Sequence, residues 1–170
     1  MGMFRSLREL GPSVLVPLAW AFVTVAHLDL VSDHTMFFAH VVMAVLLAGF
    51  AVTGRSEMQE GVLCVWWRII AVGFVVTVIG VVGFQVAPSG TVLLGVALGG
   101  WMTLPAIGFV YTGKRVTGGA WIYFGGAAAC LVGVALYAVG FFGGPELQIA
   151  GLVCVGIGQT AGILDATLRY

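Results

Sequence analysis

Six long apolar segments, separated by short polar connections, limit what this chain of 170 residues can fold into. Each segment is close to the roughly 20 residues that a helix needs to cross the hydrocarbon core of a bilayer. Hydrophobic residues make up 61% of the chain and charged residues only 8%, whereas a soluble domain has about 25% charged residues. The sequence therefore predicts one all-α integral membrane domain over residues 1–170, with six transmembrane helices at about 12–31, 35–54, 62–85, 91–112, 119–142 and 147–168.

Charge sidedness supports six crossings. The N-terminus, the 55–61 and 113–118 connections and the C-terminus fall on one side and carry six of the seven Lys and Arg residues. Arg68 lies just inside the third segment, and its long side chain can reach the same side. The other side carries acidic residues and no Lys or Arg. Because basic residues are retained on the cytoplasmic side, we expect a multi-pass protein of the cell membrane with both termini inside.

A glycine, a threonine and a basic residue recur at the ends of three segments, at 49–55, 108–114 and 162–169. This recurrence predicts three tandem helical hairpins, at about 12–54, 62–112 and 119–168. The alternative is that such endings recur at inner membrane boundaries without a shared origin. In either case the histidines occur only in the first hairpin.

All three histidines lie within the 14 residues 27–40, together with two aspartates. Imidazole and carboxylate groups are suitable ligands for Ni, Co, Zn and Cu. His34 is predicted in the outer loop, while His27 and His40 are predicted at similar depth on antiparallel helices. The first hypothesis is therefore that the protein binds or transports a divalent transition metal through His27, Asp33, His34 and His40.

The segment His27-Leu-Asp-Leu-Val-Ser-Asp33-His34 resembles the H-P-x-x-G-x-D-H segment of the hydrogenase/urease accessory nickel-permease family. His27, Asp33 and His34 match in identity and spacing, while Leu28 and Val31 replace the family's Pro and Gly. The later histidine-rich stretches of that family are missing. The resemblance covers eight residues and implies a small six- or seven-helix transporter for nickel or cobalt.

A second hypothesis is a b-type haem protein in electron transfer, with His27 and His40 as axial ligands, or one of them alone. The simpler interpretation of each residue is a neutral histidine bonded to a backbone carbonyl or to Thr24.

Two more polar residues lie within predicted spans. Gln159 is interpreted as an interhelical hydrogen-bonding residue, and Asp165 as a carboxylate paired with Arg68 or Arg169. The functional alternative makes both residues a relay leading inward from the histidines.

The third hypothesis is a non-enzymatic subunit or scaffold of a larger membrane complex. Its partners in that complex would be other proteins or further copies of the same chain. The chain lacks the signatures of common hydrolases, zinc proteases, nucleotide-binding proteins and c-type haem proteins, so an enzyme is the less favoured class. Its net charge of zero gives no argument for a nucleic-acid partner. The bilayer is the expected environment.

Aromatic and small residues are given packing roles. Trp66, Trp67, Trp121 and Tyr123 are predicted near the inner interface, as an aromatic belt. The pairs Gly95/Gly99 and Gly158/Gly162 are predicted to allow close helix contact.

Overall fold

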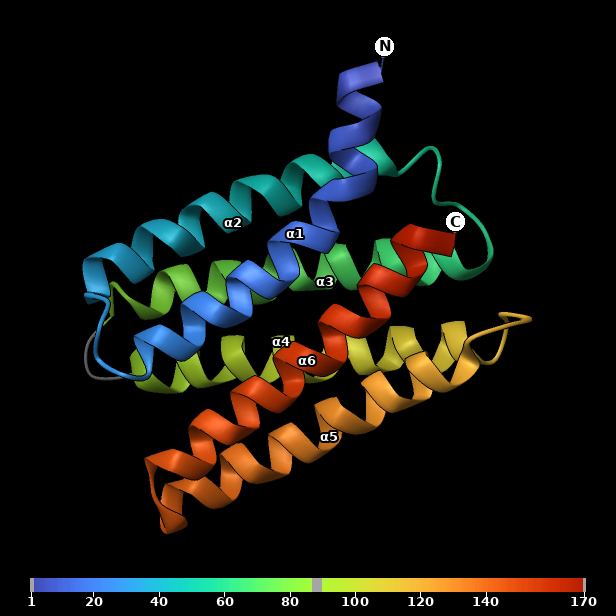
Figure 1. Ribbon diagram of the computed structural model, residues 1–170. Coiled ribbons are helices and arrows are strands. Elements are labelled where there is room, and N and C mark those ends of the chain that lie inside the picture. The colour runs from blue at the N-terminus through green and yellow to red at the C-terminus, as the bar shows by residue number, and fades with distance from the viewer. Residues whose placement is uncertain (1, 87–89, 170) are drawn as a thin grey trace.

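The fold is entirely helical in the part of the chain that the computed structural model describes, residues 2–86 and 90–169, with side chains described for residue 11 and from residue 13 onward. Figure 1 shows the long helices running back and forth between two ends of the molecule. Their bounds are α1 Gly2–Ala26, α2 Asp33–Gly54, α3 Gly61–Gly83, α4 Gly90–Gly113, α5 Ala120–Gly143 and α6 Pro145–Arg169. The predicted all-α class is confirmed.

Local sequence signals account for several helix boundaries. Ser32 is the N-cap of α2 and its hydroxyl accepts a hydrogen bond from the Thr35 backbone N–H at 3.3 Å, which satisfies a donor that the helix leaves unpaired. Gly144 has a φ of 116°, a value that L side chains rarely adopt. Pro145 then begins α6 with a backbone angle suited to a first helical turn. Gly144 therefore forms the tight turn between α5 and α6.

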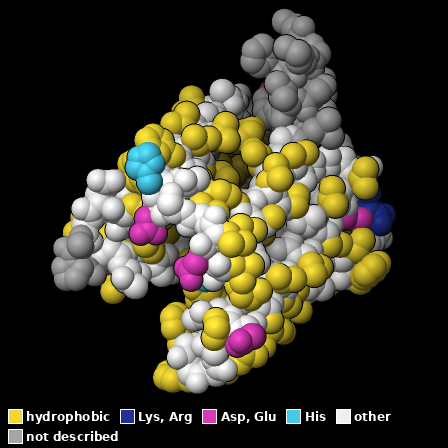
Figure 2. Space-filling view, turned by 60° about the vertical axis from the view of Figure 1, so that its left-hand side comes forward, with side chains coloured by type: hydrophobic (Ala, Val, Ile, Leu, Met, Phe, Trp, Pro, Cys, Tyr) yellow, Lys and Arg dark blue, Asp and Glu magenta, His cyan; other side chains and the backbone are white. Residues whose placement is uncertain are grey.

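Five of the helices, α2 to α6, are long and apolar enough to cross a membrane. In α1 the apolar part is the shorter stretch Ser13–Ala26, counted over the described side chains. The face of the molecule in Figure 2 is mostly apolar, with few charged side chains. This surface is that of a protein surrounded by lipid, as the composition predicts.

The helices follow one another in space in the order α2, α3, α4, α5, α6, α1, each packed on the next. Within the predicted hairpins, α3 packs on α4 and α5 packs on α6. The first helix behaves differently, because its main contact is with α6 and not with α2. The N-terminal helix therefore lies against the C-terminal one, as Figure 1 shows.

The two ends of the bundle differ in charge. We call the end where α1, α3 and α5 finish the histidine end, and the end where α2 and α4 finish the basic end. The sequence at the histidine end contains Asp29, Asp33 and Glu146, while Arg55, Lys114 and Arg115 follow α2 and α4 at the basic end.

Close backbone packing joins α5 to α6. A Cβ atom added at Gly133 would lie 2.6 Å from the carbonyl oxygen of Gly151, and one added at Gly158 would lie 2.6 Å from the Ala129 Cβ. The predicted close contact at Gly158 is confirmed. Gly95 and Gly99 differ, because added Cβ atoms there meet no described atom within 4 Å.

The main hydrophobic core lies between α1, α4, α5 and α6. Its members are Trp20, Met102, Ala106, Phe109, Tyr123, Ala127, Cys130, Leu152 and Val155. Tyr123 is 1% exposed, so its predicted place in an interfacial aromatic belt is wrong. None of these core residues comes from α2, whose main contact is with α3.

Candidate functional site

His27 binds a tyrosine from a distant part of the chain. Its Nε2 lies 2.8 Å from the Tyr137 hydroxyl of α5, and its Nδ1 lies 2.9 Å from the Val23 carbonyl oxygen. Because a carbonyl only accepts hydrogen bonds, Nδ1 is the donor in the bond to Val23. With Tyr137 at Nε2, both ring nitrogens have protein partners.

His40 is held against α3. Its Nδ1 donates to the Met36 carbonyl oxygen at 2.9 Å, and its ring meets the Phe84 ring edge-to-face with centroids 5.1 Å apart. A Cβ added at Gly80 would lie 2.9 Å from the His40 ring, so glycine makes room for the imidazole. The backbone bond fits the simpler interpretation of this histidine and leaves the Nε2 lone pair directed away from its own helix turn.

Asp33 and His34 lie in the first turn of α2, and both are exposed. The prediction of His34 in a loop is wrong, because the Ser32 cap starts the helix before it. Its ring packs on Phe38, with centroids 4.8 Å apart. The negative charge of Asp33 stabilises the N-terminus of α2.

The structure brings the histidines to one end of the bundle but onto different partners. His27 contacts α5, while His40 contacts α3. Over residues 2–86 and 90–169, no group of three or more His, Cys, Asp or Glu side chains is placed to hold a metal ion. Metal binding through His27, Asp33, His34 and His40, and haem ligation by His27 and His40, stay predictions.

A second polar centre surrounds Gln159 in the bundle interior. Its Oε1 accepts from the Trp20 indole N–H at 2.9 Å, and its Nε2 donates to the Trp101 carbonyl oxygen at 2.9 Å. The Trp101 indole in turn donates to the Thr77 hydroxyl at 2.9 Å. This chain of bonds joins α1, α6, α4 and α3, so the predicted interhelical role of Gln159 is confirmed.

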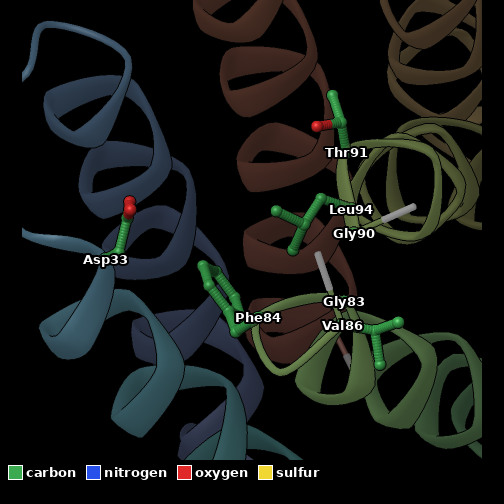
Figure 3. A pocket seen from close by; sticks show the side chains of 7 residues that line it. All are labelled: Asp33, Gly83, Phe84, Val86, Gly90, Thr91 and Leu94. Atoms are coloured by element: carbon green, nitrogen blue, oxygen red, sulfur yellow. The ribbon is translucent and has the colours of Figure 1, made fainter. Parts of the chain in front are cut away.

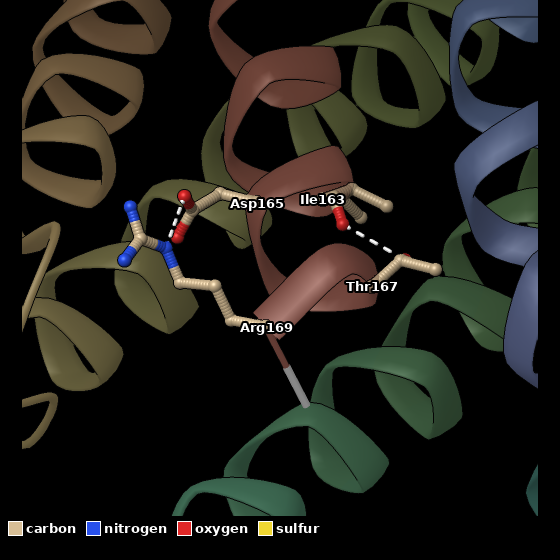
Figure 4. A network of polar contacts seen from close by, with 4 residues as sticks. All are labelled: Ile163, Asp165, Thr167 and Arg169. Atoms are coloured by element: carbon tan, nitrogen blue, oxygen red, sulfur yellow. Dashed lines mark hydrogen bonds and ion pairs between the residues drawn. The ribbon is translucent and has the colours of Figure 1, made fainter.

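Asp165 lies one turn before the end of α6 and pairs within that helix. Figure 4 shows its carboxylate facing the Arg169 guanidinium, with the Arg169 Nε 2.6 Å from Oδ1. On the next turn the Thr167 hydroxyl donates to the Ile163 carbonyl oxygen at 3.0 Å. The predicted pairing with Arg169 is confirmed, whereas the relay through Gln159 and Asp165 stays a prediction.

Several tryptophan indoles donate hydrogen bonds to neighbouring helices. Besides Trp20 and Trp101, Trp66 donates to the Thr112 hydroxyl at 3.1 Å, and Trp67 donates to the Ala51 carbonyl oxygen at 2.8 Å. The aromatic-belt interpretation of the sequence missed these interhelical bonds. Trp121, which is 77% exposed at the start of α5, remains consistent with a belt position.

A cavity of about 260 Å³ opens at the histidine end. Figure 3 shows Asp33 from α2 on one side, and on the other the end of α3 with the residues that follow it, and the start of α4. The lining residues are Asp33, Gly83, Phe84, Val86, Gly90, Thr91 and Leu94. Sequence reasoning singled out Asp33 but not its neighbours, which reach the cavity only through the packing of three helices.

No protein family, curated protein or solved structure matches this chain.

Proposed function

We propose that the chain is a non-enzymatic structural subunit of a membrane assembly. The observation that supports this proposal best is that the interior Gln159 side chain bonds across helices to the Trp20 indole N–H and to the Trp101 backbone carbonyl. An active site or transport site needs several polar groups directed at one substrate position. Groups that hold helices together need partners on neighbouring helices instead.

In this proposal all six helices cross the cell membrane, with the basic end and both termini in the cytoplasm. The 25 residues of α1 are sufficient in length for the sixth crossing. The exposed residues Arg55, Lys114 and Arg115 mark the basic end, and the positive-inside rule assigns that end to the cytoplasm.

Cross-linking through the single lysine tests the subunit role. Lys114 is exposed in the connection between α4 and α5, so an amine-reactive cross-linker in native membranes should join it to a neighbouring subunit. We expect a discrete adduct that also co-purifies in a mild detergent. Lys114→Arg is the matched control, since it keeps the charge but loses the reactive amine. A chain recovered only at its own mass of 17.7 kDa, without adducts, would contradict the proposal.

Elemental analysis and visible absorption separate this proposal from the metal and haem hypotheses. We expect the purified protein to carry neither a stoichiometric transition metal nor a haem absorption band. Nickel, cobalt, copper or zinc that is lost in Asp33→Ala would support metal handling instead. Iron with an absorption band that is lost in His40→Ala would support haem.

A further inference from the structure

The cavity at the histidine end combines one carboxylate with an apolar and aromatic lining. Asp33 is exposed and makes no ion pair with any residue that the structure describes. Across the cavity from it lie the Phe84 ring and the Leu94 side chain, as Figure 3 shows. A ligand here meets one negative charge and otherwise mostly hydrocarbon.

This combination selects among ligand classes. An anion would be repelled by Asp33. A calcium ion takes six to eight oxygen ligands, and among the described lining residues the side chains supply only the Asp33 carboxylate and the Thr91 hydroxyl. An organic ammonium group suits the lining better, because its charge pairs with a carboxylate and its carbon substituents pack on apolar and aromatic surface.

The size of the cavity and the charge around it agree with this class. The cavity is open to the surface, and its volume of about 260 Å³ is slightly below the roughly 300 Å³ at which drug-sized ligand pockets begin, so it covers only a small group. At this end Asp29, in the connection after α1, and Glu146, in the first turn of α6, add negative charges, and the connections carry no Lys or Arg. A surface of one sign raises the local concentration of oppositely charged ligands.

We propose that this cavity binds a small organic ammonium group, with Asp33 as its counter-ion and Phe84 as its aromatic wall. The group is either a free solute or the headgroup of a lipid at the membrane surface. The inference is independent of the structural role proposed above.

The first test titrates choline against the protein in a maltoside detergent, followed by calorimetry or ligand-observed NMR. The control ligand is 3,3-dimethylbutan-1-ol, which has the shape of choline without its charge. We expect Asp33→Asn to weaken choline binding about five- to tenfold, and Phe84→Leu to weaken it about fivefold. Asp29→Asn is the matched control, because it removes a charge from the same end at a residue that does not line the cavity. Asn also accepts the φ of 57° at that position.

Equal binding of the neutral alcohol, equal losses in Asp33→Asn and Asp29→Asn, or no choline binding at all would overturn the proposal. A second arm identifies the source of the ammonium group. In nanodiscs of anionic lipid alone, a free solute should bind as it does in detergent. If the natural ligand is a headgroup, phosphatidylcholine in the nanodisc should suppress choline binding in the wild type.

Discussion

At the scale of single residues, Gln159 is the most connected polar side chain of the bundle interior. It is 3% exposed and bonds to α1 through Trp20 and to α4 through the Trp101 carbonyl. If such a buried amide is removed, the groups that were bonded to it remain in an apolar environment without a hydrogen-bond partner, which costs free energy. The Gln159 side chain therefore determines how α6 sits against its neighbours.

Replacing Gln159 by leucine should lower the free energy of unfolding by about 1–2 kcal/mol, because the Trp20 N–H and the Trp101 carbonyl lose a partner. Unfolding in a denaturing detergent, followed by helical circular dichroism, measures this change. Thr103→Val is the control, since the exposed Thr103 hydroxyl bonds only within its own helix, to Gly99 and Gly100. Similar losses in both variants would show that the Gln159 bonds contribute nothing specific.

The His27–Tyr137 contact should appear as a coupling energy. In a double-mutant cycle with His27→Ala and Tyr137→Phe, we expect the two effects on unfolding to be non-additive by about 0.5–1.5 kcal/mol. His27→Ala combined with Tyr111→Phe should be additive, because Tyr111 lies toward the other end and stacks with Arg115. Additivity in both cycles would mean that the hydrogen bond has no net effect on stability.

These residues also show what the sequence can and cannot predict about the site. The bonds of His27 and His40 to carbonyls four residues earlier are local, and so is the Asp165–Arg169 pair. Local geometry follows from helical periodicity, so these were predictable. The bond from His27 to Tyr137 spans 110 residues and depends on which helices become neighbours, which periodicity does not determine.

At the scale of helices, glycines divide into packed and open positions. Gly158 of α6 lies so close to α5 that an added Cβ would meet its backbone, while Gly95 of α4 faces open space. Both occur in the same small-xxx-small pattern, so the sequence alone predicted one role for both. The pattern indicates that close contact is possible, and only the arrangement of the helices decides whether it occurs.

Alanine substitutions should separate the two kinds of position. Gly158→Ala places a methyl group against Ala129 and should destabilise the protein by about 1–3 kcal/mol through overpacking. Gly95→Ala should be neutral or stabilise by up to about 1 kcal/mol, since alanine favours the helix. Detergent unfolding curves of the two variants measure the difference. A large loss in Gly95→Ala would indicate that α4 uses this face in a contact with another chain.

At the scale of the whole molecule, the sequence predicted the bounds of the helices better than it predicted which helices pack on one another. The predicted spans of α2 to α6 differ from the observed helices by at most two residues at either end, because loss of apolar character marks where such helices end. The contact of α1 with α6 was missed, because consecutive elements are usually adjacent. It depends instead on particular side chains, such as Trp20, which packs on Gly156.

The proposed orientation can be tested in intact cells with inserted epitopes. An epitope placed after Leu30, which is 72% exposed at the histidine end, should bind antibody without permeabilisation. An epitope at the C-terminus should bind only after permeabilisation, because that end is expected inside. The opposite labelling pattern would reverse the orientation, and the same labelling pattern at both sites would place them on one side of the membrane and contradict six crossings.

The contact between α1 and α6 sets a delay during synthesis. Trp20 and its partner Gln159 are 139 residues apart, so at about 5–20 residues per second the ribosome needs roughly 7 to 28 seconds to supply the second after the first. During that interval the Trp20 indole N–H lacks the partner that it has in the complete fold. The packing of α1 on α6 is therefore among the last contacts that the growing chain can form, although α1 is the first helix to be made.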